Sequence, residues 1–579
     1  MKSKAWFLLV AAVLFVSIGE FATSIVRSQE EQLVPSGKYS SDSFECRNGV
    51  VVSASTLASR AGQAILQQDG NAVDASVATA FALAVTYPAA GNIGGGGFML
   101  VYPEPARGKP VVFDYRETAP AAAWPTMFSK EDSQYKHKSV AVPGTVRGMA
   151  KAHEHFGSLD WSLLLQPAIE LAKGGFAIDP YLADLLNDVL ASATDAVELQ
   201  RVFAQPDGRR WQAGDRLIQP DLAKTLQLIA DQGADVFYLG AIAKEIVSEM
   251  RRGDGIITSD DLSSYQTVER RPLSTTYRNE YEVFVPPPPS SGGTCLLEEL
   301  NILQTFDLKQ MDRWSPELFH VMAECMRRAS YDRARYIGDP AFVDIPSKLT
   351  TRFYGEELAK TIDLLKATRS LDIAADIPVD QEGENTTHFS VIDKNGMAVA
   401  NTYTLERIWG SRIVVKGMGF LLNNDMRAFN IFPGVTDTKG GLGTAPNCIE
   451  PGKRPISSQM PTIVAKDGKV LLVTGSPGSQ AIPNTILGIL VSTLDYGLPL
   501  RDAVDAPRFS QSWMPDQIIF EAPERYPALT SALKRLGHNV IRSGPLPQGD
   551  AHSIWVTEKG LRIGVADRRR NNRATALGY

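Results

Sequence analysis

Apolar and polar positions alternate along the chain in patterns that predict strands and helices in mixed order. Short, largely apolar runs at 50–55 and 98–102 predict strands, and the alanine-rich segment 72–86 predicts a helix that packs closely on a sheet. Further strands are expected at 111–115, 139–142, 281–285, 419–424, 470–473, 553–557 and 564–567, and further helices at 222–232, 316–336 and 481–494. This alternation predicts the α/β class.

Residues 385–405 predict a β-hairpin. Its first strand, 385–393, and its return strand, 397–405, flank a Lys-Asn-Gly turn. A three-residue turn with its glycine in the left-handed region sets Thr386 opposite Thr404, whereas a two-residue Asn-Gly turn sets Thr386 opposite Leu405. From these residues alone, a polar cross-strand pair on a half-buried sheet is the simplest interpretation.

A glycine-rich segment at 91–100 has the sequence GNIGGGGFML. It leads into a strand rather than a helix, and no Gly-Lys-Ser/Thr follows it, so phosphate binding is disfavoured. Glycine has no Cβ, and a run of glycines therefore predicts a place where two backbones approach closely.

Residues 1–28 predict a secretory signal peptide. Lys2 and Lys4 precede an apolar run of 13 residues at 6–18, which is too short for a spanning helix. The small residues at 22–24 could precede cleavage, and the alternative is an uncleaved segment that tethers the protein to the membrane. We expect an exported chain, periplasmic or secreted, with no other membrane insertion.

Composition narrows the classes of function. The chain is 44% hydrophobic and 21% charged, as is usual for globular proteins, and its net charge of -6 argues against a nucleic-acid partner. The four cysteines are too far apart for a zinc site, and both free thiols and disulfides remain open. No cofactor is expected. On the helix at 316–336, Arg327, Arg328, Arg333 and Arg335 most simply form a charged face.

A set of ordered motifs covers nearly all of the mature chain. They are 91–100 (GNIGGGGFML), 114–120 (DYRETAP), 142–144 (VPG), 286–293 (PPPPSSGG), 386–393 (TTHFSVID), 402–405 (TYTL), 419–424 (GFLLNN), 453–458 (KRPISS), 474–478 (TGSPG) and 564–569 (GVADRR). In identity and order they resemble the γ-glutamyltransferase family, within the N-terminal nucleophile hydrolases. The resemblance implies a four-layer αββα sandwich.

The resemblance also implies a precursor that cuts itself between Asn385 and Thr386. The products would be a large subunit, 29–385, and a small subunit, 386–579, interwoven as one domain. A threonine hydroxyl is a weak nucleophile without an adjacent base, and the α-amino group freed at Thr386 can serve as that base. No histidine triad is then required. His388, in the same strand, is expected to be a packed, hydrogen-bonded residue rather than a base.

Individual positions match the family's site residues. Thr386 matches the nucleophile and Thr404 the residue that orients it, while Gly478 and Ser479 match the oxyanion-hole amides. Arg116, Ser457 and Ser458 match the groups that hold the substrate α-carboxylate. The long loop 429–455 matches the lid over the glutamyl pocket.

Some positions depart from the family pattern. Glu406 stands where the best-known members have Asn, and Asp425 stands where Gln or Glu is usual. Ala428 replaces an Asp that binds the substrate α-amino group, and Ser479 replaces a glycine whose backbone amide survives the change. We hypothesise that Glu406 and Asp425 supply the missing negative charge. Otherwise the pocket would prefer an acyl group without an amine, such as glutaryl.

The implied function is transfer of a γ-glutamyl group from glutathione, or a related small molecule, to water or to an amino acid or peptide. One alternative is an acylase of the glutaryl-cephalosporin type. The other is a non-catalytic binding homologue, against which the intact Thr386, Thr404, Arg116 and Ser457-Ser458 argue.

Overall fold

Two antiparallel seven-stranded sheets form the centre of the computed structural model, which describes residues 42–373, 386–436, 443–544, 547–570 and 573–579. The first sheet has the order β19 (Thr575–Gly578), β2 (Val50–Ser53), β10 (Thr387–Ile392), β11 (Ala398–Thr404), β3 (Gly96–Tyr102), β4 (Val111–Asp114) and β7 (Val268–Arg270). The second sheet has the order β1 (Ser43–Cys46), β18 (Arg562–Ala566), β17 (His552–Val556), β13 (Lys469–Thr474), β12 (Thr462–Lys466), β9 (Tyr281–Val285) and β8 (Leu273–Tyr277).

The two sheets pack face to face through one side of each strand. Val52 and Leu100 of the first sheet share a buried apolar cluster with Ile463, Val473 and Ile554 of the second. Because side chains alternate across a strand, the other side of each sheet must be covered by a different layer.

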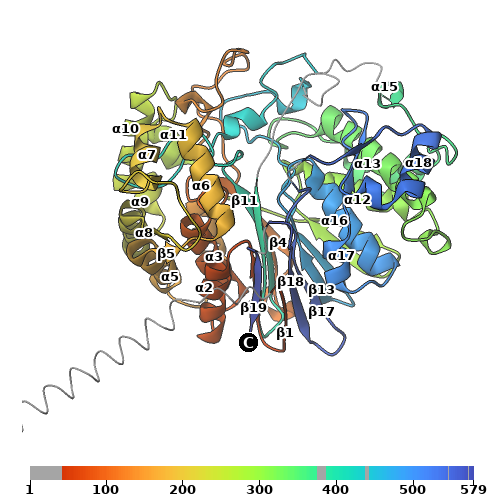
Figure 1. The fold of residues 1–579 in the computed structure, drawn as a ribbon, viewed down its shortest axis with the longest axis horizontal. Coiled ribbons are helices and arrows are strands. Elements are labelled where there is room, and N and C mark those ends of the chain that lie inside the picture. Colours follow the sequence, from red (N-terminus) through yellow and green to blue (C-terminus); the bar gives the residue numbers. More distant parts are fainter. Residues whose placement is uncertain (1–41, 374–385, 437–442, 545–546, 571–572) are drawn as a thin grey trace, which may run out of the picture. The chain divides into compact units, whose positions relative to one another are not determined.

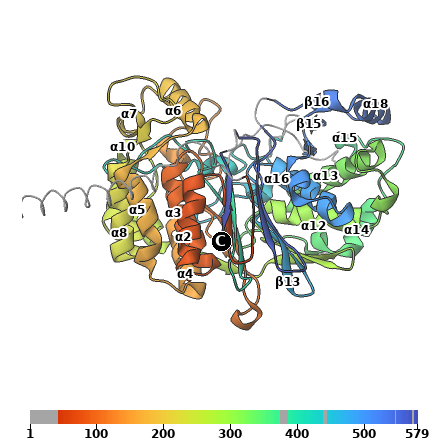
Figure 2. The ribbon, with the colours of Figure 1, turned by 60° about the horizontal axis from the view of Figure 1, so that its bottom comes forward.

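Helices cover both outer faces. α2 (Thr56–Gln67), α3 (Ala72–Thr86), α5 (Trp161–Gly174) and α8 (Pro220–Gln232) share one core cluster with the first sheet. α12 (Ser291–Leu303), α13 (Pro316–Tyr336) and α16 (Ala481–Leu490) share another with the second sheet. Figures 1 and 2 show the two helix groups on either side of the strands. The expected αββα sandwich is confirmed.

The remaining elements are short or peripheral. The other helices are α4 (Thr145–Phe156), α6 (Pro180–Ser192), α7 (Val197–Phe203), α9 (Asp235–Tyr238), α10 (Ala241–Arg252), α11 (Ser259–Ser264), α14 (Arg352–Ala359), α15 (Ser370–Ile373), α17 (Leu500–Asp505) and α18 (Pro527–Leu536). The other strands are β5 (Phe176–Ala177), β6 (Arg216–Leu217), β14 (Phe509–Ser510), β15 (Ile518–Phe520) and β16 (Val540–Arg542).

The helix that supports β10 and β11 begins and ends where the sequence predicts. Asn71 caps α3 by accepting from the amides of Val73 and Asp74 at 2.9 and 3.0 Å, and Asp74 accepts in return from the Asn71 amide at 2.9 Å. This capping box fixes the first turn. Every residue of α3 is buried, as its small side chains allow.

Two expected strands, 139–142 and 419–424, are absent from the described residues. Their ladders are replaced by isolated bridges of Val142 with Thr118 and of Leu422 with Gly94. The side chain of Asn423, itself within 419–424, joins the two segments by bonding the amide and the carbonyl of Ala141 at 2.9 Å, and it also donates to the Gly94 carbonyl at 2.8 Å.

No helix within the described ranges is long and apolar enough to cross a membrane. All four cysteines are free thiols. The predicted signal segment, 1–28, and the predicted cut residue Asn385 lie outside the described residues.

Candidate active site

The hairpin of β10 and β11 has the three-residue turn. Thr387 pairs with Tyr403, the Asp393 amide donates to the Met397 carbonyl at 3.0 Å, and Gly396 has φ of 94°. Continued by one residue, this register places Thr386 opposite Thr404. The two-residue alternative is excluded.

Thr386 continues the face of β10 that points toward the second sheet. Two and four residues further on, His388 lies against Gly475, and the Ser390 hydroxyl donates to the His552 carbonyl at 2.9 Å. Side chains at even positions of β10 therefore share this face. Thr386 is 6% exposed, so it lies at the edge of the core.

The glycine run lets another chain segment pass directly beside Thr404. A Cβ on Gly95 would lie 1.8 Å from the Thr404 carbonyl oxygen, and one on Gly97 would lie 2.2 Å from that of Thr402. Close backbone approach, as expected, is the reason for this run.

Arg116 lies in a fully buried cluster of charges. Its guanidinium donates to Glu117 Oε2 at 2.9 Å and to Asp425 Oδ1 at 2.7 Å. The same guanidinium reaches the Ile456 carbonyl at 3.5 Å, which brings it next to Ser457. Segments far apart in the sequence thus meet at one cation.

Burial and neighbouring charges shift the pKa values of the groups in this cluster. Burial opposes the positive charge of Arg116, but Asp425, Glu117 and Glu406 outweigh it and raise its pKa. Burial and the adjacent Asp425 raise the pKa of Glu117 well above its usual range. Arg116 Nε, Glu117 Oε1 and Asp425 Oδ2 have no hydrogen-bond partner within the described part of the chain. These atoms are suited to bind a polar ligand.

Glu406 connects Thr404 to this cluster. Its amide donates to Thr404 Oγ1 at 2.8 Å, and its carboxylate is one of the charges that raise the pKa of Arg116. Glu406 has φ of 74°, which a non-glycine residue adopts only at some cost.

Asn423 holds the cluster in position, and the sequence analysis did not single it out. Its amide group donates to the carbonyls of Gly94 and Ala141 at 2.8 and 2.9 Å. Its oxygen accepts from the amides of Ala141 and Asp425 at 2.9 and 3.0 Å. The paired asparagines of the GFLLNN motif were the available signal.

The proline loop supports Ser457 and Ser458. The Ser457 amide donates to the Pro289 carbonyl at 2.9 Å, and its carbonyl accepts from the Ser291 amide at 2.8 Å. A Cβ on Gly292 would lie 2.4 Å from the Ser458 carbonyl oxygen, which explains a glycine there. The PPPPSSGG and KRPISS motifs therefore form one structure.

Gly478 and Ser479 form a turn between β13 and α16 with consecutive left-handed φ values of 130° and 49°. Neither backbone amide donates to a hydrogen bond among the residues described. The same turn begins at Gly475, whose added Cβ would meet His388 Cε1 at 2.2 Å, two residues from Thr386. Such a turn presents adjacent amides to an anion.

A model of the γ-glutamyltranspeptidase family matches residues 58–577. The chain belongs to this family. It is 41% identical to the glutathione hydrolase proenzyme of Escherichia coli (strain K12) over 92% of each chain. It is 40% identical to that of Pseudomonas sp. (strain A14), covering 92% of this chain and 94% of the relative. The solved cephalosporin acylase from Bacillus halodurans is similar, with a TM-score of 0.82 and 26% identity over 94% of this chain and 98% of that one.

Membership of the γ-glutamyltranspeptidase family makes the chain an enzyme of the γ-glutamyltransferase type with the N-terminal nucleophile hydrolase fold. His388 bonds Thr402 Oγ1 at 2.8 Å and Ser390 Oγ at 3.0 Å, and burial lowers its pKa well below the usual range. It is a packed, hydrogen-bonded residue, as expected.

Ala428 and the loop that follows it were both singled out in the sequence. Ala428 is 7% exposed and ends the short 3₁₀ turn that begins at Asp425. Because the residue is an alanine, this γ-glutamyltranspeptidase family member has no carboxylate at that position. The loop at 429–455 is described except for 437–442, and the lid role of the whole loop stays a prediction.

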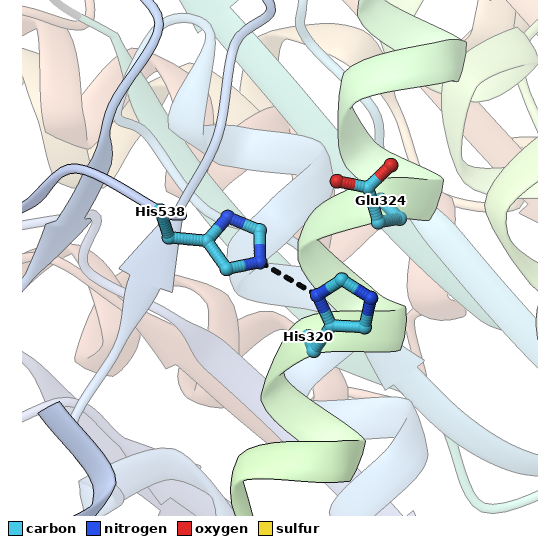
Figure 3. Close-up of side chains that lie close together, drawn as sticks. All are labelled: His320, Glu324 and His538. Atoms are coloured by element: carbon cyan, nitrogen blue, oxygen red, sulfur yellow. Dashed lines mark hydrogen bonds between the residues drawn. The ribbon is translucent and has the colours of Figure 1, made fainter. Parts of the chain in front are cut away.

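One group among the described residues has metal-ligand chemistry: His320, Glu324 and His538 (Figure 3). His320 Nδ1 and His538 Nε2 are 2.7 Å apart, a direct hydrogen bond and closer than two ligands of one ion normally lie. Glu324 already pairs with Arg328 at 2.6 Å and Arg327 at 3.4 Å. We interpret these three residues as a hydrogen-bonded network in the core of this γ-glutamyltranspeptidase family member, not as a metal site.

Proposed function

We propose that the chain is the precursor of an exported γ-glutamyltransferase that cuts itself before Thr386 and then uses Thr386 as its nucleophile. The register that sets Thr386 opposite Thr404 carries the proposal. The relatives named glutathione hydrolase proenzymes support glutathione as the donor.

Self-cleavage would begin with attack of the Thr386 hydroxyl on the Asn385 carbonyl carbon. The Asn385–Thr386 peptide bond breaks as an ester bond forms, and the Thr386 nitrogen takes up the hydroxyl proton. Water then hydrolyses the ester, which leaves a carboxylate on Asn385 and a free α-amine on Thr386. The products are the subunits 29–385 and 386–579, after loss of 1–28.

The same atoms would carry turnover. The α-amine, with a reference pKa of about 7.7, takes the proton of the Thr386 hydroxyl as the oxygen attacks the γ-carbonyl of the donor. The oxyanion accepts from the amides of Gly478 and Ser479, each worth on the order of 3 kcal/mol. The amine of cysteinylglycine leaves with the proton. Water, or the amine of an amino acid or peptide, then attacks the acyl ester.

The buried charge cluster would select the acyl group. Arg116, with the Ser457 and Ser458 hydroxyls, fits the α-carboxylate because a guanidinium offers paired planar donors. The unpartnered Asp425 Oδ2 and the nearby Glu406 favour an ammonium group close by. These carboxylates support a γ-glutamyl rather than a glutaryl group.

Removing one hydroxyl tests the nucleophile. Thr386→Ala should leave a single uncut chain on denaturing electrophoresis and no hydrolysis of a γ-glutamyl anilide. Thr387→Val is the matched control, because Thr387 lies on the opposite face of the hairpin, and it should still be cut. An uncut wild-type chain would favour the binding homologue, and self-cleavage of the Thr386→Ala chain would refute the mechanism.

A glutaryl acylase is the second candidate function. Ala428 favours it, since the carboxylate that binds an α-amine is missing there, and so does the similarity to a cephalosporin acylase structure. Hydrolysis of γ-glutamyl and glutaryl anilides should be measured side by side. We expect the γ-glutamyl compound to have the higher kcat/KM, and equal or faster glutaryl turnover would overturn the glutamyl assignment.

A further inference from the structure

A surface hollow of about 400 Å³ lies beside the proline loop, and Arg270, which contacts the Arg116 cluster through Asp114, is part of its lining. Its lining residues come from the end of β7 and the start of β8, from the proline loop and the start of α12, and from 340–350, which include the 3₁₀ turn Ser347–Thr350. None of the site residues discussed above lines it.

The polar atoms in the hollow are suited to an anion. Arg270 and Arg271 both line it; Arg271 is exposed and forms no ion pair with any described residue. The carboxylate in the lining, Glu269, is already close to Lys151 at 3.6 Å and His155 at 3.3 Å. Arg270 pairs with Asp114 at 2.7 Å and lies 4.0 Å from Asp339, so Arg271 is the guanidinium in the lining that is left to compensate an anion.

Thr294 adds a second, independent signal. The residue lines the hollow and is 4% exposed, and its buried hydroxyl has no hydrogen-bond partner in the described structure. A buried hydroxyl without a partner costs free energy, which a ligand in the hollow would recover. Thr294 also lies in the first turn of α12, whose amide dipoles favour negative charge.

Apart from Thr350, the rest of the lining is apolar. Leu273, Pro287, Pro288, Pro346 and Leu349 form walls that favour a hydrocarbon body. We propose that the hollow binds a small organic carboxylate with a compact apolar body, held by Arg270, Arg271 and the Thr294 hydroxyl.

The hollow is connected to the carboxylate-binding residues by two short paths. Arg270 donates to Asp114 Oδ2 at 2.7 Å, and Asp114 Oδ1 accepts from the Arg116 amide at 3.0 Å. On the other side, Pro288 is followed by Pro289, whose carbonyl accepts from the Ser457 amide at 2.9 Å. An occupant that draws Arg270 away from Asp114 would loosen Arg116. This consequence rests on the proposed function and predicts a higher donor KM with kcat unchanged.

Binding is tested first, without turnover. Cyclohexanecarboxylate is titrated into the mature enzyme by calorimetry, with the uncharged cyclohexanecarboxamide as the matched probe. We expect saturable binding of the carboxylate alone. Arg271→Gln, at an exposed position, should weaken it about 10-fold, and Thr294→Val should weaken it several-fold, since each removes one donor.

Donor kinetics follow with the same proteins. Without added carboxylate, Arg271→Gln and Thr294→Val should hydrolyse the γ-glutamyl anilide like wild type. With it, only wild type should show the raised KM. Equal binding of carboxylate and carboxamide, or equal binding by wild type and both variants, would overturn the proposal. A chain that turns over no γ-glutamyl donor yet binds the carboxylate in this pattern would overturn the proposed function and leave the hollow assigned.

Discussion

Asp425 has one carboxylate oxygen bound to Arg116 and one left for a ligand. One oxygen accepts from Arg116 at 2.7 Å, and the other has no partner among the described residues. A substrate that brings both a carboxylate and an ammonium can compensate Arg116 and engage the second oxygen together. A substrate without the ammonium leaves Asp425 in competition with its carboxylate for Arg116.

Replacing this carboxylate should therefore separate the two acyl groups. For Asp425→Asn we expect the KM of a γ-glutamyl anilide to rise about 10- to 100-fold, because one charge-assisted hydrogen bond to the substrate is lost. The KM of a glutaryl anilide should stay level or fall. Asp425→Glu, which keeps the charge, is the control and should lie closer to wild type. An equal rise for both anilides would show that Asp425 acts only through the fold.

At the scale of elements, the start of β3 passes so close to the end of β11 that the residues there must be glycines. Gly95→Ala would push the Thr404 carbonyl, because the added Cβ lies 1.8 Å from that oxygen. We expect self-cleavage, measured by electrophoresis over time, to slow strongly or stop. Gly488→Ala is the matched control: Gly488 is inside α16 with nothing within 4 Å, so alanine should be neutral or stabilise by up to about 1 kcal/mol. Normal cleavage by Gly95→Ala would contradict the close-approach argument.

Local patterns were sufficient for elements whose partners are local. The sequence predicted α3 as 72–86, α13 as 316–336 and β9 as 281–285, and the structure has those bounds, since caps and periodicity define them. For the hairpin the sequence left two registers open, and the structure has the one with the three-residue turn. The strands expected at 139–142 and 419–424 were wrong: the segments form isolated bridges only, and the side chain of Asn423 bonds the backbone of Ala141 where a strand ladder was expected.

The arginines of α13 also show that sequence patterns do not reveal contacts between residues far apart in the chain. Arg327 and Arg328 were expected on a charged face, but they are only 2% and 4% exposed. Arg327 pairs with Asp516, and Arg328 pairs with Glu324 and bonds the Thr361 carbonyl at 2.8 Å. The Asp516 partner lies far along the chain, so helical periodicity alone could not reveal that Arg327 is buried. In the candidate site, motif identity gave Arg116 and Asp425 but not their direct ion pair.

At the scale of the whole molecule, a cut before Thr386 would leave strands of both fragments in each sheet. In the first sheet, β10 and β11 of the later fragment lie between β2 and β3 of the earlier one. A second junction involves the end of the earlier fragment: the Ser370 amide donates to Asp516 Oδ2 at 2.8 Å, and the Ala367 amide donates to the Leu536 carbonyl at 2.7 Å. The two fragments should therefore remain associated after cleavage.

The His320–His538 hydrogen bond joins the same two fragments and should make their association depend on pH (Figure 3). Burial, then His320 and Arg327, lowers the pKa of His538 to about 4, whereas an unfolded histidine titrates near roughly 6.5. Above pH 6.5 neither state holds the proton. As the pH falls from 6.5 to 4, the unfolded chain binds a proton that the folded chain does not, so the free energy of unfolding falls by up to about 3 kcal/mol.

Urea unfolding of the mature enzyme at pH 7.5, 6 and 5 should therefore show a falling midpoint, and His538→Gln should flatten that slope. The slope should not vanish, because burial also lowers the pKa of His388 and of His552. His155→Gln is the control: its side chain is 42% exposed, and its removal should leave the slope as in wild type. If the slope for His538→Gln were as steep as that of wild type, the acid sensitivity would come from His388 and His552 and not from the His320–His538 hydrogen bond.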